Sequence, residues 1–183
     1  MKKLTISALL ACIIALASGT AMAQKFAPID KSPLSITYYP ITASMESKAP
    51  LIKVLYSRPY KKGREIFGKM EKYGEVWRAG ANQETEVRFY KNVTIAGTEV
   101  PAGTYSMFII PEKDSWTFIF NKQTDHWGAY SYDKSMDVVR AKVATKTPST
   151  NLENFSITFM DDTSGPTLVA GWDNVMASLP IKM

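Results

Sequence analysis

Cysteine and histidine are nearly absent from this sequence of 183 residues, which contains one of each. The cysteine, Cys12, lies in an apolar stretch near the N-terminus, so the chain after Ala23 contains no thiol. That absence excludes disulfide frameworks, zinc fingers and cysteine nucleophiles from the main part of the protein. A single histidine, His126, does not form a multi-histidine metal site, so we expect no metal and no cofactor.

An excess of charge of one sign is also lacking. The sequence contains 22 basic and 17 acidic residues, and without Lys2 and Lys3 the net charge falls from +5 to +3. The basic residues are mostly lysines dispersed among acids. We therefore expect neither a nucleic-acid partner nor binding to an anionic membrane surface. Glycine-rich phosphate loops and calcium-loop spacings are absent as well.

The N-terminus has the pattern of an export signal. Lys2 and Lys3 precede an apolar stretch over residues 4–17, and Ala21 and Ala23 supply the small residues that a signal peptidase reads. This stretch is short for a bilayer span, which requires about 20 residues. The sequence predicts a signal peptide over residues 1–23 and a mature chain over 24–183 without a transmembrane segment, located in the periplasm or outside the cell.

Cys12 allows an alternative to soluble export. The sequence Leu9-Leu10-Ala11-Cys12 resembles a lipoprotein cleavage box, after which Cys12 would carry the lipid anchor. Residues 13–16 are apolar, however, where a polar tether is expected. Soluble export is therefore favoured over lipid anchoring.

Alternation of apolar and polar residues recurs along the mature chain, as half-buried strands require. The candidate strands are Leu34–Tyr39, Ile52–Tyr56, Val87–Phe89, Val93–Ile95, Thr104–Ile110, Trp116–Phe120, Asp137–Val143, Phe155–Phe159, Pro166–Trp172 and Val175–Ile181. Turn-forming residues separate these runs, for example Ala96-Gly97. We predict an all-β protein, a single antiparallel β-sandwich or jelly-roll domain over residues 24–183. A transmembrane barrel is disfavoured because these runs are shorter than its strands of about 9 to 11 residues.

One segment, Ser57–Glu84, breaks the alternation and contains four glycines and one proline. It predicts a long ordered loop rich in arginine, glycine and aromatic residues, with one helical turn that packs Ile66, Phe67 and Met70. Ordered loops of this length are commonly functional or packed by their own side chains.

Three of the five arginines of the mature chain, Arg58, Arg64 and Arg78, fall in this loop, accompanied by Trp77. Arginine among aromatics suits anion recognition, because the guanidinium binds carboxylate or phosphate with two N–H groups while its face stacks on rings. The alternative is that the arginines fix the loop to the sheet. Their partners would then be the nearby acidic residues Glu65, Glu75, Glu84 and Glu86.

Four further residues are candidates for a binding site. Asn82 and Glu84 follow Gly80, and Glu84 is a general acid or base only if it is desolvated. His126 and Trp127 precede Gly128 in a turn-rich stretch, where we expect Trp127 to be exposed. By contrast, Trp116 and Trp172 are in phase with the alternation of their strands and are expected in the core.

These segments carry motifs that resemble a known family. The motifs are Tyr56-Ser57-Arg58-Pro59, Gly63-Arg64, Ile66-Phe67-Gly68, Val76-Trp77-Arg78-Ala79-Gly80-Ala81-Asn82, residues 101–105, Trp127-Gly128 and residues 137–140. The set is similar to the signature of the exported bacterial family called domain of unknown function 2911, over about residues 32–181. Ala79 stands where the family often has threonine. The resemblance implies export and a single β-rich domain, and it transfers no catalytic residues.

Three hypotheses remain open from the sequence. The leading one is a non-catalytic binding module that uses the Arg and aromatic loop for a small anionic or sugar-like ligand, or for a protein partner of the cell envelope. The second is an envelope hydrolase with Glu84 or His126 as its acid or base. The third is a structural envelope protein whose loop arginines are internally paired.

Overall fold

The computed structural model describes residues 24–183, and the predicted signal peptide over residues 1–23 lies outside this range. Within the described residues the protein contains strands and one short 3-10 helix, and no α-helix. The elements are β1 (Leu34–Tyr39), β2 (Ile52–Ser57), β3 (Thr85–Phe89), β4 (Val93–Ile95), β5 (Thr98–Val100), β6 (Gly103–Pro111), β7 (Ser115–Asn121), η1 (Lys134–Met136), β8 (Asp137–Lys146), β9 (Leu152–Asp162), β10 (Gly165–Asp173) and β11 (Val175–Pro180). The predicted all-β class is confirmed.

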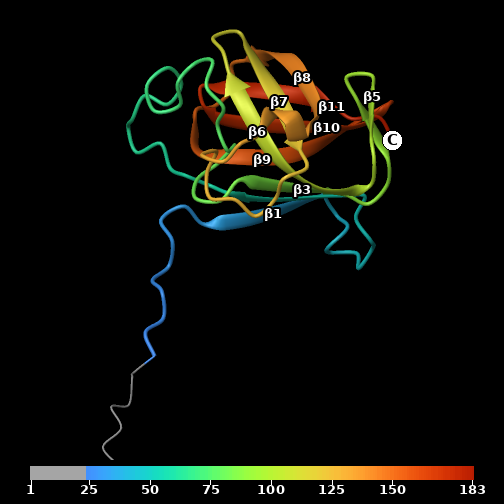
Figure 1. Ribbon diagram of the computed structural model, residues 1–183, viewed down its shortest axis with the longest axis horizontal. Helices are drawn as coiled ribbons and strands as arrows, with labels where there is room; N and C mark the ends of the chain where they lie inside the picture. The colour runs from blue at the N-terminus through green and yellow to red at the C-terminus, as the bar shows by residue number, and fades with distance from the viewer. Residues whose placement is uncertain (1–23) are drawn as a thin grey trace, which may run out of the picture.

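Nine strands form one antiparallel sheet in the order β1-β2-β3-β6-β7-β8-β11-β10-β9. The sheet curls on itself until it is nearly closed (Figure 1), and its edge strands β1 and β9 approach each other. The ring centroids of Tyr39 on β1 and Phe159 on β9 are 5.8 Å apart. Strands β4 and β5 form a separate hairpin beside the sheet.

The free edge of β9 is covered by the end of β2 and by the residues that follow it. The backbone of Ile157 on β9 donates to the hydroxyl of Tyr56 and accepts from it, both at 3.1 Å. Phe155 N–H donates to the carbonyl oxygen of Pro59 at 3.1 Å. These bonds satisfy backbone N–H and C=O groups of β9 that an open sheet would expose. Unpaired groups at a strand edge promote association with other chains, so the contacts protect this edge.

The interior of the curled sheet is the hydrophobic core. Alternate residues of the strands point inward, as Phe155, Ile157 and Phe159 do on β9, each less than 5% exposed. Trp116 and Trp172 are fully buried, so their predicted place in the core is confirmed. The period-two alternation therefore reports which face of each strand is inside.

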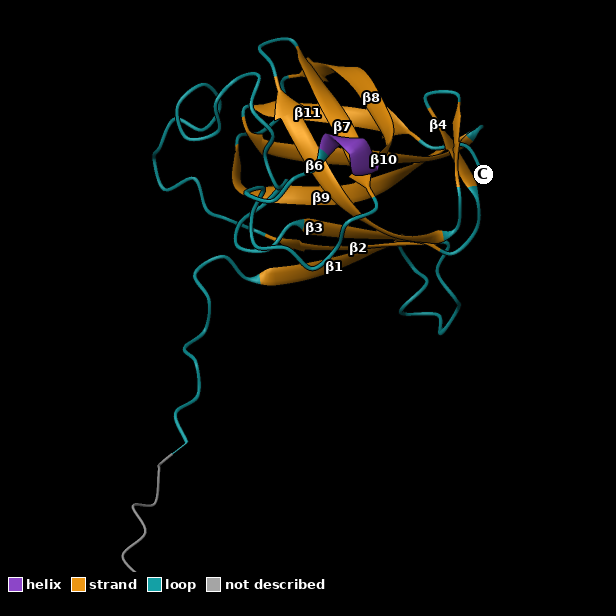
Figure 2. Cartoon of the chain, in the orientation of Figure 1, coloured by secondary structure: helices purple, strands orange, loops and turns teal. Residues whose placement is uncertain are grey.

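The predicted turn at Ala96-Gly97 is confirmed. Ala96 and Gly97 connect β4 to β5, and both have positive φ values, 49° and 82°, which suit a two-residue hairpin turn. The longest connection within the sheet joins β2 to β3 and contains no strand or helix element. Figure 2 shows this connection as loop at one end of the molecule, with the β4–β5 hairpin at the other end.

Candidate functional site

The segment between β2 and β3 is fixed to the core by three side chains. Ile66, Phe67 and Trp77 are buried, whereas Met70, which we expected to pack with them, is 37% exposed. One turn forms here, because Met70 N–H donates to the carbonyl oxygen of Ile66 at 2.9 Å. Trp77 also exchanges two backbone hydrogen bonds of 2.8 Å with Ile109 on β6.

Trp77 is part of the core. The residue is 4% exposed, and its ring lies nearly parallel to that of Trp172, with ring centroids 5.9 Å apart. Its indole N–H donates to the carbonyl oxygen of Gly80 at 3.0 Å, so the buried polar atom has a partner. Trp77 therefore positions the backbone beside Arg78 and Gly80.

Arg58 binds the edge of β9. Its Nε donates to the carbonyl oxygen of Phe155 at 3.2 Å, and its Nη2 donates to Ser156 Oγ at 2.9 Å. The side chain is half-buried between the two edges of the sheet. Its recorded hydrogen bonds thus join the segment after β2 to β9.

Arg64 and Arg78 line one polar cavity of about 490 Å³ together with Glu71 and Asn82. Glu71 and Arg78 also line a second cavity of about 190 Å³. Arg64 is exposed, and its guanidinium donates to the carbonyl oxygens of Lys61 and Tyr60. The structure therefore brings together two of the three loop arginines.

Burial raises the pKa of the Glu71 carboxyl from 4.5 to about 7, although the positive charges of Arg78 and Arg64 act to lower it. Desolvation disfavours the charged form of a carboxyl group, and here this effect exceeds the attraction of two cations. No ion pair within 4.0 Å joins Glu71 to either arginine in residues 24–183. The charge of the cavity consequently depends on pH near neutrality.

The backbone between Arg78 and Glu84 makes a tight turn that presents its carbonyl oxygens. Ala79 and Asn82 have positive φ values of 53° and 62°, a conformation that asparagine tolerates better than most residues. The carbonyl oxygen of Asn82 accepts from Arg78 Nη1 at 3.0 Å and from Gly128 N–H at 2.9 Å. These bonds hold Arg78 at the wall of both cavities.

Glu84 and His126 are joined through the backbone. Glu84 N–H donates to the carbonyl oxygen of His126 at 3.2 Å, and Glu84 Oε1 accepts from His126 N–H at 3.0 Å and from Ser106 Oγ at 3.1 Å. The imidazole Nδ1 of His126 lies 3.0 Å from Ser131 Oγ. Neither Glu84 nor His126 lines the two cavities that contain Arg78.

Trp127 is 58% exposed, as the sequence predicts, and it follows His126 on the same segment. Tyr130, which is 83% exposed, lies with its ring centroid 5.9 Å from the Arg78 guanidinium carbon. An arginine at this distance from an aromatic face is weakly attracted to it. Tyr130 also lines the smaller cavity, so an aromatic side chain borders the Arg78 site.

The candidate residues thus fall into three groups. The first group lines the larger cavity and consists of Arg64, Arg78 and Asn82. The second group has structural contacts: Arg58 binds β9 and Trp77 packs in the core. The third group lies on two adjacent segments next to the cavity and consists of Glu84, His126 and Trp127. The loop arginines bond mainly to carbonyl oxygens. Two of the expected glutamate partners are paired with lysines instead, Glu75 with Lys72 and Glu86 with Lys53.

Sequence reasoning missed Glu71 and gave Tyr130 no role. Nothing in the spacing distinguishes Glu71 from Glu65 or Glu75, because its burial results from the turn at Ile66 and from the approach of Arg78. The bond from Gly128 to Asn82 helps to place the segment of Tyr130 beside Arg78. Both relationships are made by tertiary contacts.

Within residues 24–183, no group of three or more histidine, cysteine, aspartate or glutamate side chains is arranged to hold a metal ion. In the same range, no helix has both the length and the apolar character to cross a membrane.

Comparison with known proteins identifies the family of this chain. Neither the curated proteins nor the solved structures include a significant match to this chain. A family model described as "Protein of unknown function (DUF2911)" matches residues 40–181, which include the β2–β3 segment and all the cavity residues named above. The chain therefore belongs to this family, in agreement with the resemblance of its motifs.

Proposed function

We propose that this protein is an exported, non-catalytic binding module that holds a small anion in the Arg64–Glu71–Arg78 cavity, the larger of the two cavities described above. The observation that carries the proposal is that two guanidinium groups line one polar cavity, whose only acidic lining residue has a pKa of about 7. Guanidinium groups bind carboxylates and phosphates with paired, charge-assisted hydrogen bonds. The ligand class is therefore a small molecule that bears carboxylate or phosphate groups.

The hydrogen bonds of the arginines support this proposal. Arg78 donates through Nη1 to Asn82, and Arg64 donates through Nε and Nη2 to its own loop. In the part of the chain that the structure describes, Nε and Nη2 of Arg78 and Nη1 of Arg64 make no hydrogen bond to the protein. Donors fixed at one end by the protein bind an anion with a smaller loss of side-chain entropy.

Protonation of Glu71 would increase the attraction. The ionised carboxylate offsets one of the two positive charges, whereas the neutral acid leaves both for the ligand. The neutral acid also has an O–H that donates to an anion. Binding of the anion is thus coupled to proton uptake.

The remaining parts of the proposal concern the fold and the location. We propose that the two halves of the curled sheet pack face to face as a sandwich, with the β2–β3 segment as an ordered loop that supports the cavity. We also propose that the chain is exported and cleaved after Ala23, because two lysines, a short apolar stretch and small residues before the cleavage site match the pattern of a signal peptide. Mass spectrometry of the protein from the periplasmic fraction tests the cleavage site, and a retained N-terminus contradicts it.

Isothermal titration calorimetry with sulfate and with oxalate at pH 6 tests the binding function. Sulfate represents the phosphate class and oxalate the carboxylate class. At least one of them is expected to bind, and Arg78→Ala is expected to weaken that binding about tenfold or more, the usual cost of a lost charge-assisted bond. Arg88→Ala, at an exposed position outside the cavity, is the control. Absence of binding by both anions, or equal binding by the two variants, contradicts the proposal.

A further inference from the structure

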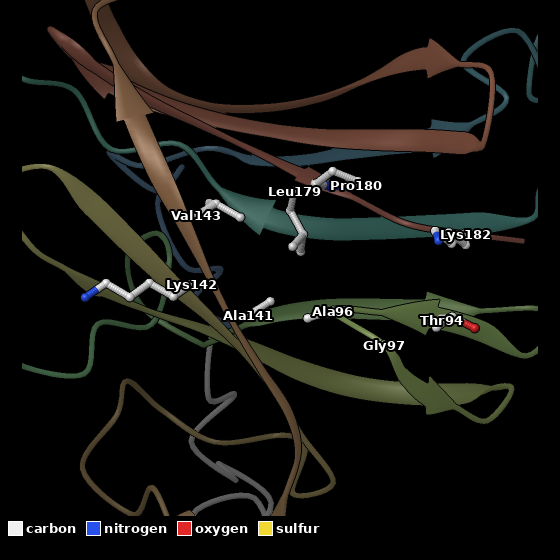
Figure 3. A pocket seen from close by; sticks show the side chains of 9 residues that line it. All are labelled: Thr94, Ala96, Gly97, Ala141, Lys142, Val143, Leu179, Pro180 and Lys182. Atoms are coloured by element: carbon white, nitrogen blue, oxygen red, sulfur yellow. The ribbon is translucent and has the colours of Figure 1, made fainter.

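A third cavity lies at the other end of the molecule, between β8 and β11 and under the turn of the β4–β5 hairpin (Figure 3). Its volume is about 360 Å³, within the range of small-molecule sites. Only Met176↔Lys146 and Ala177↔Thr145 are paired between these two strands. The cavity occupies the place where this pairing stops.

Four of the lining residues are ones that a continued register would pair. Extending the register by two and three residues would place Leu179 opposite Val143 and Pro180 opposite Lys142, and all four line the cavity. Pro180 has no N–H group, so it has no donor with which to continue the ladder to β8. The strands separate here, and the sheet is open along part of this seam.

The hairpin covers one side of the opening. Thr94 on β4 exchanges two backbone hydrogen bonds with Lys182, which follows β11, at 2.9 and 3.0 Å. This contact holds the turn at Ala96 and Gly97 over the cavity. The opening is thus built from three segments that are far apart in the sequence.

The floor of the cavity is apolar. Figure 3 shows the side chain of Leu179 pointing into the space toward Ala96 and Ala141, and Val143 pointing toward Leu179. Leu179 and Ala141 are 2% exposed, so the apolar surface continues into the core. Such a floor favours a hydrocarbon group, which gains free energy when it leaves water.

The rim of the cavity is cationic. Lys142 and Lys182 are its only charged lining residues, and the ion pairs of residues 24–183 include neither of them. Figure 3 shows the Lys142 ammonium group pointing away from the cavity. Lys182 lies at the opposite end of the opening, beside Thr94, and lysine stems lie readily along apolar surface.

We propose that this cavity binds a linear aliphatic carboxylate, with its chain on the Leu179 floor and its carboxylate at the rim beside Lys182. An apolar floor with Lys182 at its rim and no acid in its lining complements an anionic amphiphile. A neutral hydrocarbon would make no use of the Lys182 charge. The site is independent of the Arg64–Glu71–Arg78 cavity, called the arginine cavity from here on, because the two cavities share no lining residue.

Titration of the purified protein with dodecanoate by isothermal titration calorimetry tests the site. We expect micromolar affinity, and about fivefold weaker binding by Lys182→Glu, a change at an exposed side chain that leaves the backbone bonds to Thr94 intact. Val143→Trp fills the cavity and is expected to reduce the affinity at least tenfold. Lys113→Glu, in the turn between β6 and β7, is the charge-matched control and should bind as the wild type does.

The outcomes distinguish binding at this cavity from binding at the arginine cavity. Arg78→Ala is expected to leave the dodecanoate affinity unchanged, and a loss of binding in this variant would place the carboxylate at the arginine cavity and overturn the proposal. It is likewise overturned if the wild type does not bind dodecanoate, or if Lys182→Glu and Lys113→Glu bind equally well. Thermal unfolding of each variant verifies that it is folded, and Lys182→Glu carries the test if Val143→Trp does not fold.

Discussion

The hydroxyl of Tyr56 donates to the carbonyl oxygen of Ile157 and accepts from its N–H, both at 3.1 Å. The two residues are 101 positions apart and belong to β2 and β9, strands that are not neighbours in the order of the sheet. One side chain therefore replaces the partner strand that β9 lacks at this point. This contact and the bonds of Arg58 bring the two ends of the sheet together next to the arginine cavity.

Tyr56→Phe tests this contact. The variant leaves the N–H and carbonyl oxygen of Ile157 without their partner in a buried environment, so we expect a loss of about 2 to 3 kcal/mol in the free energy of unfolding. Urea denaturation measures the loss. Tyr90→Phe, at an exposed position, is the control and should change stability by less than about 0.5 kcal/mol. Equal stability of the two variants would show that the contact contributes nothing.

Arg58→Ala tests whether Arg58 contributes to stability or to anion binding. Two hydrogen bonds to β9 are lost, so we expect the free energy of unfolding to fall by about 1 to 2 kcal/mol. The affinity for sulfate or oxalate should remain within about twofold of the wild type, because Arg58 does not line the arginine cavity. A binding defect without a loss of stability would instead assign Arg58 to the ligand.

Much of the fold follows from the sequence for a simple reason. A strand that is buried on one face has a side-chain period of two, so residues such as Phe155 and Ile157 report their orientation locally. The ends of strands are less well predicted. β9 begins at Leu152 and ends at Asp162, beyond the alternating run, because its pairing with β10 continues into polar residues.

The candidate site was predicted only in part. The sequence indicates the loop and its arginines, but it does not show that Arg58 is half-buried and donates to β9, whereas Arg64 is exposed and donates to its own loop. Only the nearly closed sheet, which brings β9 beside the segment after β2, decides between these two arrangements. The pKa of Glu71 likewise depends on burial by distant residues, which local patterns do not carry.

Gly80→Ala should destabilise the turn beside Arg78. A Cβ atom at Gly80 would lie 2.9 Å from the carbonyl oxygen of Ser57, a backbone atom that is fixed at the end of β2. We expect a loss of about 2 to 4 kcal/mol, measured by urea denaturation. Gly63→Ala is the matched control, because its Cβ would meet no atom within 4 Å and would add only the strain of a positive φ. If Gly63→Ala is the more damaging change, the close approach at Gly80 is not the cause.

Glu71 makes the stability of the protein depend on pH. The carboxyl keeps its proton up to a pKa of about 7 in the folded state but releases it near 4.5 when unfolded, so folding takes up a proton between these values. Stability contributed by this group is therefore complete below pH 4.5 and is lost as the pH rises to 7. Glu71→Gln should remove the loss and be more stable than the wild type at pH 8, by up to about 3 kcal/mol.

Urea denaturation at pH 5 and pH 8 measures this difference. Glu75→Gln is the control, because Glu75 is exposed and is paired with Lys72 at the surface. It should leave the pH dependence of the wild type unchanged. A Glu71→Gln protein that loses as much stability as the wild type between the two pH values would rule out this assignment.

The affinity for sulfate, measured by calorimetry at pH 5.5 and pH 8.5 in the wild type and in Glu71→Gln, tests the central claim most directly. Sulfate keeps its charge over this range, so a change in affinity reports the protein. We expect the wild type to bind about fivefold more tightly at pH 5.5, where Glu71 is neutral, and Glu71→Gln to bind tightly at both values. Equal pH dependence in the two proteins, or no binding by either, would contradict an anion site between Arg64 and Arg78.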